Sequence, residues 1–194
     1  DQIINRYKKY FSRIIIEGDK GIFDAMNKGV QLAKGKWIFF LNSGANFNNK
    51  SVLKNMIKLS NNQSEIIFGH CIIKNKFISY KYFGNYFRQN DISMPFHHQS
   101  SFTRKKLLIK DPFDLNYFIS ADFDFLVKQF KNNKKFQKID LIVSKVTSGG
   151  QSDKYRFWAY RDNFKILKKN KFIKNKLIKL YYLFIIMVVK KIIK

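Results

Sequence analysis

The sequence predicts an α/β domain in which a mostly parallel central sheet is flanked by helices and followed by a basic amphipathic helical tail. One observation is the apolar run WIFFL at residues 37–41, which has the length of a strand and is typical of one covered on both faces. A second is the apolar face of helical spacing that precedes it, formed by Phe23, Met26, Val30 and Ala33. The third is the tail from Lys171, where lysines flank ten consecutive apolar or aromatic residues, 180–189.

The elements around the central strand follow from local composition. Residues 2–10 predict the end of a helix, and the β-branched residues 12–16 predict an early strand of the sheet. Residues 42–44 are small and polar, which favours a turn at the carboxyl end of the central strand. Open α/β sheets bind their ligands at that end.

The middle of the chain alternates between helix and strand. Residues 51–60 predict a helix, residues 65–73 a strand, and residues 77–80 the second arm of a hairpin. Residues 83–94 show no clear period and predict a loop over the site. Residues 99–103 predict a strand that leads into a short basic helix.

The last part of the chain predicts a helix that begins after Ser120, a strand over residues 138–146, a glycine loop over residues 147–152 and a helix over residues 155–167. We therefore divide the chain into a domain over residues 1–154 and a helical, basic and apolar extension over residues 155–194. The apolar run of the tail is too short to span a bilayer, which takes ~20 residues. It suits a helix on an anionic membrane surface, with a helix packed on the domain or on another subunit as the alternative.

The composition supplies material for a core and a strong positive charge. Of the 194 residues, 45% are hydrophobic, and 38 basic against 13 acidic residues give a net charge of +25. Such a charge attracts polyanions, but the sequence holds no recognisable nucleic-acid-binding motif, so no specific nucleic acid is expected as a partner. Cys71 is the only cysteine and no signal peptide is visible, which favours the cytoplasm.

Five blocks of sequence, in order, carry a resemblance to a known family: DKGIFDAMNKG, AKGKWIFFLNSG, PFHHQSSF, ISADFDFL and SGGQS. They resemble the family 2 glycosyltransferases of GT-A fold that assemble bacterial surface polysaccharides of the colanic-acid type. The resemblance implies transfer of a sugar, with inversion, from a nucleotide-diphosphate sugar to a hydroxyl of a glycan or lipid-linked glycan. It also implies a peripheral protein at the inner face of the cell membrane. The family's opening strands are absent, so we expect a fragment of a longer chain.

The same resemblance implies the residues of the site. Asp122 matches the catalytic base, which takes the proton from the acceptor hydroxyl. Asp124, His98 and Gln99 match positions that support that base or lie on the acceptor side of the site. The donor-binding positions that it implies are Asp19, Lys20, Gly21, Ala25, Asn27, Asn42, Ser43 and Gly44.

The family's cofactor is a divalent ion, Mn²⁺ or Mg²⁺, and this chain departs from the family at that point. Ala45 stands where an aspartate usually ligates the ion. Asn42, Ser43 and Asn46 offer only neutral oxygens, whereas hard cations prefer carboxylates. We therefore assign no metal ligand and expect weak metal binding.

Three interpretations have alternatives. Asp122 and Asp124 lie in the first turn of a helix, where the dipole favours their ionised form, and acids there are also ordinary helix stabilisers. His97 and His98 suggest zinc, but adjacent residues on a strand face opposite ways, which favours a hydrogen-bonded pair. The chain could also be a non-catalytic nucleotide- or glycan-binding domain, or a basic binder of nucleic acid.

Overall fold

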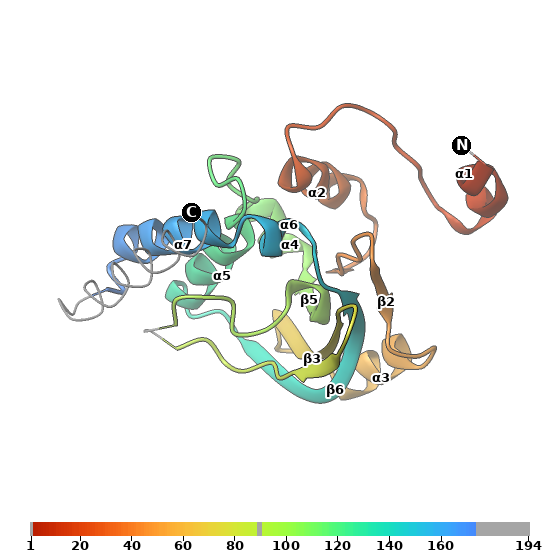
Figure 1. The fold of residues 1–194 in the computed structure, drawn as a ribbon. Coiled ribbons are helices and arrows are strands. Elements are labelled where there is room, and N and C mark those ends of the chain that lie inside the picture. Colours follow the sequence, from red (N-terminus) through yellow and green to blue (C-terminus); the bar gives the residue numbers. More distant parts are fainter. Residues whose placement is uncertain (1, 89–90, 174–194) are drawn as a thin grey trace.

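The computed structural model describes residues 2–88 and 91–173 (Figure 1). Its helices are α1 (Gln2–Tyr7), η1 (Lys8–Tyr10), α2 (Ile22–Leu32), α3 (Val52–Leu59), η2 (His98–Ser100), α4 (Lys105–Lys110), α5 (Ala121–Lys131), α6 (Gln151–Lys154) and α7 (Arg156–Lys169). Its strands are β1 (Trp37–Ile38), β2 (Ala45–Phe47), β3 (Ile66–Lys74), β4 (Ser79–Tyr82), β5 (Ser101–Arg104) and β6 (Phe136–Thr147). The predicted α/β class, with a sheet flanked by helices, is confirmed.

The sheet is mixed, which corrects the expectation that it is mostly parallel. Its order is β1-β5-β3-β6-β2, with β4 paired to β3. The long central strands β3 and β6 run parallel, while β1 with β5, β5 with β3, β3 with β4 and β2 with β6 pair antiparallel. Strands β2 and β5 run antiparallel to the central pair. An apolar run in the sequence predicts a buried strand, but it does not predict the direction of the strands beside it.

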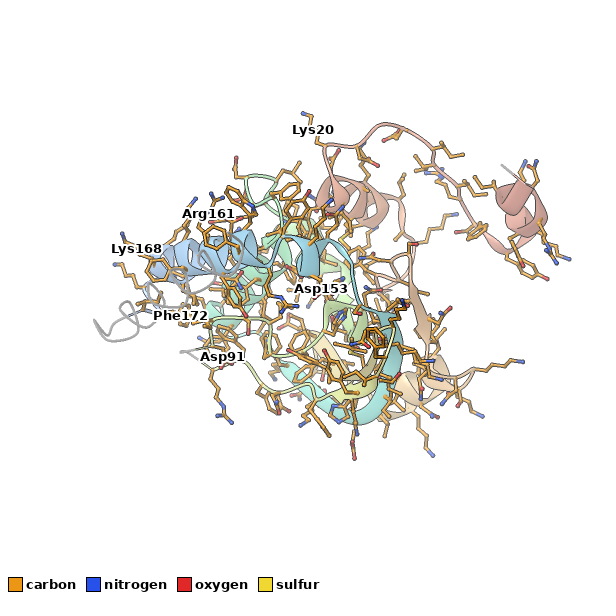
Figure 2. All side chains as sticks on the ribbon, in the orientation of Figure 1. Lys20, Asp91, Asp153, Arg161, Lys168 and Phe172 are labelled. Carbon is orange, nitrogen blue, oxygen red and sulfur yellow. The ribbon has the colours of Figure 1, made fainter. Side chains whose placement is uncertain are left out.

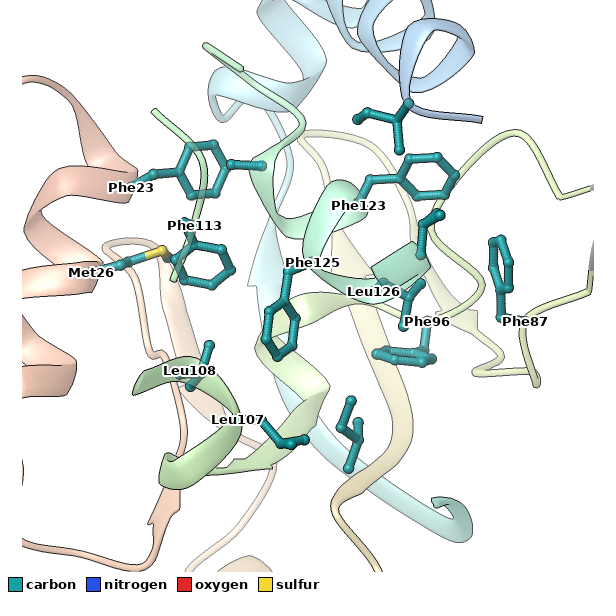
Figure 3. Close-up of a cluster of buried hydrophobic side chains, with 14 of the residues drawn as sticks. Phe23, Met26, Phe87, Phe96, Leu107, Leu108, Phe113, Phe123, Phe125 and Leu126 are labelled. Atoms are coloured by element: carbon teal, nitrogen blue, oxygen red, sulfur yellow. The ribbon is translucent and has the colours of Figure 1, made fainter. Parts of the chain in front are cut away.

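Hydrophobic clusters cover both faces of the sheet, as the composition of residues 37–41 predicts. Ile66 and Phe68 of β3 lie in the larger cluster with residues of α2, α4, α5 and α7, and Figure 3 draws part of this cluster. Ile67 lies in the smaller cluster with residues of α3. Regular pairing in β1 ends at Ile38, yet Phe39 and Phe40 continue the alternation. The ring of Phe39 is 4.4 Å from that of Phe102 in the smaller cluster, and the ring of Phe40 is 5.6 Å from that of Phe113 in the larger.

The expected early strand at residues 12–16 is wrong. These residues form no strand, and the side chains of Ile15 and Ile16 are 47% and 75% exposed. A strand needs a neighbour to satisfy its backbone groups, and residues 12–16 pair with no described strand. Figure 1 shows the segment from α1 to α2 extending away from the sheet.

The loop that follows β4 crosses strand β3 at close distance. Residues 83–88 and 91–94 form the predicted loop, and Gly84 lies against β3 so closely that a Cβ there would meet the carbonyl oxygen of Gly69. The Gly84 N–H donates to Nδ1 of the buried His70 at 3.1 Å, and Nε2 of His70 is 3.0 Å from Oδ1 of Asp140. The imidazole therefore links the loop to two strands.

The C-terminal helix α7 packs on the rest of the fold. Ile166 and Leu167 are fully buried in the larger cluster, and the partly buried Phe172 and Ile173 pack against the same cluster. The division of the chain after residue 154 stays a prediction, and residues 174–194, which hold the expected amphipathic tail, lie outside the described residues. Among the described helices, none is long and apolar enough to cross a membrane.

Candidate active site

A cavity of about 880 Å³ lies where β3 and β6 end and where β5, α5 and α7 begin. Asn75 and Thr147 mark the strand ends on its wall, and Ser120 and Asp122 mark the start of α5. This is the edge of the sheet at which the sequence places the ligand. Asp153 of α6, which also lines the cavity, is labelled in Figure 2.

Asp122 lies on the cavity wall with its carboxylate held by its own helix. Oδ1 accepts the backbone N–H of Phe123 at 2.8 Å, and the side chain is 20% exposed. Burial raises the pKa of Asp122 to about 6 and outweighs this hydrogen bond, which acts to lower it. The expectation that the helix start favours the ionised form is therefore corrected: desolvation is the larger effect. A carboxyl group with a pKa near 6 is still mainly ionised at neutral pH and accepts a proton readily.

His98 and Gln99 connect β5 to the loop after β1. The Asn42 side-chain Nδ2 is 3.2 Å from Nε2 of His98, and the Asn42 backbone N–H donates to Oε1 of the buried Gln99 at 3.1 Å. On its other side, Nδ1 of His98 is 3.6 Å from Oδ2 of Asp122. These contacts bring four residues of the sequence prediction to one point, although they are separated by up to eighty positions in the chain.

The two adjacent histidines do not point to opposite faces, which corrects the geometry assumed for them. His98 starts the short helix η2, and the rings of His97 and His98 stack with centroids 4.9 Å apart. Burial lowers the pKa of His97 to about 3 and that of His98 to about 4, so both rings are neutral at pH 7. Nδ1 of His97 accepts the Gln99 N–H at 3.2 Å, which fits the hydrogen-bonded pair that the sequence favours over a zinc site.

Asp124 lies away from the cavity. Its carboxylate is 1% exposed, and Oδ2 is 2.6 Å from Nζ of Lys128 one helical turn later. The lysine compensates the buried negative charge of Asp124. The two acids of the first turn therefore have different surroundings, one open to the cavity and one paired inside the fold.

The implied donor-binding residues separate into two groups. Asn42 and Ser43 line the cavity, and Gly44, at φ +82°, accepts the Thr147 N–H at 2.9 Å beside it. The other positions lie on or before α2, off the cavity wall: Asp19, Lys20, Gly21, Ala25 and Asn27. On that helix Ile22, Phe23 and Met26 reach the cavity instead.

The polar groups of α2 are used within the fold. Lys28 Nζ contacts both Glu17 and Asp19, at 2.7 and 2.8 Å. Asn27 exchanges two hydrogen bonds of 2.9 Å with the backbone of Phe113. The amide of Asn27 therefore ties α2 to the segment after α4.

Arg156 was missed by sequence reasoning. It is the one lysine or arginine among the described residues that line the cavity, and Nη2 lies 2.8 Å from Oδ1 of Asp153. The other carboxylate oxygen of Asp153 accepts the Gly149 N–H at 2.7 Å, which fixes the glycine loop. A basic residue four positions after the SGGQS block was the available signal.

The residues at the expected metal position do not fit a divalent ion. Ala45 begins β2, and its N–H donates to the Asn42 carbonyl at 3.1 Å, so the position offers the loop no carboxylate. Among the described residues, no group of three His, Cys, Asp or Glu side chains could hold a metal ion. The carboxylates on the cavity wall are Asp122 and Asp153, and the second is paired with Arg156.

Comparison with known proteins identifies glycosyltransferases among the relatives of this chain. No protein-family model matches the sequence. PGL/p-HBAD biosynthesis glycosyltransferases of Mycobacterium bovis and Mycobacterium tuberculosis are 29% identical over 131 residues, which cover 62% of this chain and 48% of theirs. The resemblance to glycosyltransferases is confirmed. The chain spans about half the length of these curated relatives.

Solved structures support the fold. Residues 1–349 of S. aureus TarS in complex with UDP-GlcNAc match with a TM-score of 0.58 at 14% identity, over 87% of this chain and 53% of that one. A second structure of residues 1–349 of S. aureus TarS matches with a TM-score of 0.56 at 17% identity, over 86% of this chain and 56% of that one. The chain therefore has a GT-A-like α/β fold.

Proposed function

We propose that the protein catalyses, in this cavity, the transfer of a sugar from a nucleotide-diphosphate sugar to an acceptor hydroxyl, with inversion at the anomeric carbon. The observation that carries this proposal is Asp122, a carboxylate on the wall of a large cavity with a pKa raised to about 6. Glycosyltransferase relatives and a structural neighbour described in complex with UDP-GlcNAc support the substrate class.

Asp122 acts as the general base. It takes the proton of the acceptor hydroxyl as that oxygen forms a bond to the anomeric carbon, and the bond from that carbon to the diphosphate oxygen breaks. The electron pair leaves with the nucleoside diphosphate. General base catalysis contributes ~10²–10⁴ in rate, so the remaining acceleration comes from positioning and from stabilising the leaving group.

The leaving diphosphate needs positive charge, and Arg156 is positioned to supply it. Its guanidinium is the cationic side chain of the cavity wall, next to the glycine loop at Gly149 and Gly150. Asn42 and Ser43 contribute neutral donors to the same cavity wall. The mechanism therefore uses the chain's own cation at a site that does not fit a divalent ion.

We assign the acceptor to the part of the cavity wall that carries aromatic residues. Tyr80, Tyr82 and Tyr160 line it together with Met94, and the Tyr82 hydroxyl donates to the Met94 carbonyl at 2.8 Å, which holds the loop in place. Such a wall suits a glycan ring or a lipid-linked glycan. We place the protein at the inner, cytoplasmic face of the cell membrane on the basis of its basic composition and tail.

A second candidate is a domain that binds a nucleotide or glycan without turnover. Ala45 and the pairing of Arg156 with Asp153 favour it, because both reduce the charge offered to a leaving diphosphate. The two functions predict different results from one pair of measurements. Calorimetry with UDP, with and without Mn²⁺, measures binding, and release of UDP from UDP-sugars in the presence of glycan acceptors measures transfer.

Binding with release of UDP supports transfer. Binding without release under any donor and acceptor supports the non-catalytic domain. Absence of UDP binding contradicts both and removes the cavity as a nucleotide site.

A further inference from the structure

A second cleft, of about 720 Å³, lies at the edge of the sheet opposite the cavity. It is formed where β3 and β1 begin and where β5 ends in Arg104, whereas the cavity lies where β3 ends and β5 begins. Half of its twelve lining residues are basic, against 38 of 194 in the whole chain, and its one acid is Glu65. The bases are Lys34, Lys36, Arg104, Lys105, Lys106 and Lys110.

The negative charge of Glu65 is already compensated by its neighbours. Oε1 of Glu65 is 3.6 Å from Nζ of both Lys106 and Lys134, and its other oxygen accepts the Lys135 N–H at 3.3 Å. These neighbours and the hydrogen bond lower the pKa of Glu65, against the opposing effect of burial, which is the largest single contribution. The cleft therefore keeps an excess of positive charge.

Two of the bases hold the cleft together. The Arg104 guanidinium stacks on the Trp37 ring at 4.0 Å and donates to the carbonyls of Ser64 and Asn62 at 3.2 and 3.3 Å. Lys105 Nζ donates to the carbonyl of Ala33 at 2.6 Å. Their donors are thus largely used by backbone oxygens and are not arranged around one small ligand.

Three other lysines remain available. The side chains of Lys34, Lys36 and Lys110 are exposed and make no hydrogen bond or ion pair with the described part of the chain. Beside them, the apolar side chains of Leu32 and Ile109 are 37% and 41% exposed. Exposed cations without fixed partners, mixed with exposed apolar groups, suit a broad anionic layer better than a single phosphate, which takes fixed donors.

The end of the described chain lies on the same side. Helices α5 and α7 both begin at the cavity and run in one direction, since the Ser120 hydroxyl donates to the Ala159 carbonyl at their start and the rings of Phe130 and Phe172 are 5.8 Å apart at their end. Phe172, which follows α7 in the chain, is labelled below that helix in Figure 2. The turn after α5 leads directly to Lys134 and Lys135 beside Glu65.

We propose that this basic edge, defined by Lys34, Lys36 and Lys110 around the cleft, docks on the headgroups of an anionic phospholipid membrane. Docking here leaves the cavity open to solution, so the reacting hydroxyl of the acceptor reaches it from the side away from the bilayer. Charge complementarity selects the lipid surface, because each lysine near an anionic bilayer adds favourably to binding. The surface is independent of the transfer chemistry, and its test uses no nucleotide.

The test is flotation of the full chain with vesicles of phosphatidylglycerol and phosphatidylcholine in equal amounts. A variant with Lys34→Gln, Lys36→Gln and Lys110→Gln should partition on the order of 100-fold less at low salt, from the usual contribution of three lysines. The matched control is Lys74→Gln, Lys76→Gln and Lys81→Gln, three exposed lysines of the β3–β4 hairpin near the cavity edge. It removes the same charge and should retain most of the binding.

Equal losses in the two triple variants would show that only net charge matters and would overturn the proposal. Unchanged binding of the first variant would assign any membrane attachment to other segments, with the same consequence. A loss of binding to soluble polyphosphate or to a single-stranded oligonucleotide, without a loss on vesicles, would identify a polyanion partner instead. Circular dichroism confirms that each variant is folded.

Discussion

The carboxylate of Asp122 faces the imidazole of His98, with Oδ2 3.6 Å from Nδ1. The other ring nitrogen, Nε2, lies 3.2 Å from the side-chain amide nitrogen of Asn42, which can only donate. Nε2 is therefore the acceptor, and the ring proton lies on Nδ1, toward Asp122. Burial keeps this ring neutral and raises the pKa of the carboxyl group, so at neutral pH a carboxylate faces the N–H of a neutral imidazole.

The first prediction separates the two acids at the start of α5. Asp122→Asn keeps the shape and removes the base, so transfer should fall by ~10²–10⁴ while the affinity for UDP persists. Asp124→Asn removes the buried partner of Lys128, so it should lower the melting temperature and change transfer less. Initial rates and calorimetry measure both effects. Equal losses of rate and of UDP affinity in the two variants would assign Asp122 a structural role.

A second prediction concerns stability and pH at Asp122. Its pKa is about 6 in the folded chain against the 3.8 that is usual for an aspartic acid, so the folded state binds the proton more tightly than the unfolded state. The contribution of Asp122 to stability is therefore favourable at low pH and is lost as the pH rises from about 4 to about 6. Asn does not titrate, so the stability of Asp122→Asn relative to the parent should increase over that window, by on the order of 1–3 kcal/mol.

Denaturant unfolding of the two proteins at about pH 4 and about pH 7 measures that difference. The neutral histidines His97 and His98 act in the opposite sense at low pH, because their pKa values are lowered, but they are common to both proteins. A difference that stays constant with pH would mean that Asp122 is not desolvated in the folded chain.

The third prediction tests the cation of the cavity. Arg156→Gln removes the guanidinium next to the glycine loop, and a charge-assisted hydrogen bond lost there should weaken UDP binding by about 10-fold. Lys154→Gln is the control, because Lys154 is exposed on the neighbouring helix and does not line the cavity. Titration of both variants with UDP gives the comparison. An equal effect of the two substitutions would show that the cavity senses only the overall charge.

Helices α2 and α3 could be predicted because each carries its own apolar face. Phe23, Met26 and Val30 of α2 are buried as their spacing indicates, and so are Val52 and Met56 of α3. This pattern is local to each helix and is visible without the rest of the fold. The direction of a strand is not local in this way, because β2 and β5 are placed by the loops that precede them, and the mostly parallel sheet was therefore wrong.

The site shows the same division between local and long-range information. The turn at Asn42 and the start of α5 could be placed from residue type alone, and the structure joins them through His98 and Gln99. The pKa of Asp122 depends on how much protein covers the helix start, which the sequence of one turn does not contain. Arg156 was missed because its position on the cavity wall depends on how α7 packs against α5.

The last prediction concerns Ala45. Its strand partner is Val146, which lines the cavity, and its N–H closes the turn at Asn42, so a carboxylate at this position lies next to the proposed diphosphate site. Ala45→Asp should add the charged oxygen that Mn²⁺ prefers and make UDP binding depend on the ion. Asn46→Asp is the control, because it adds the same charge one residue later, where the side chain of a strand turns to the other face.

The outcome also decides between two origins of the alanine. If Ala45→Asp gains Mn²⁺-dependent binding, and the parent chain transfers sugar without the ion, Arg156 has taken over the role of the metal. If the same gain occurs but the parent chain shows no transfer, the alanine marks an inactivated copy. Calorimetry with UDP across a Mn²⁺ series measures the gain, and the absence of any difference between Ala45→Asp and Asn46→Asp would mean that the loop after β1 does not face the phosphates and that the donor site lies elsewhere in the cavity.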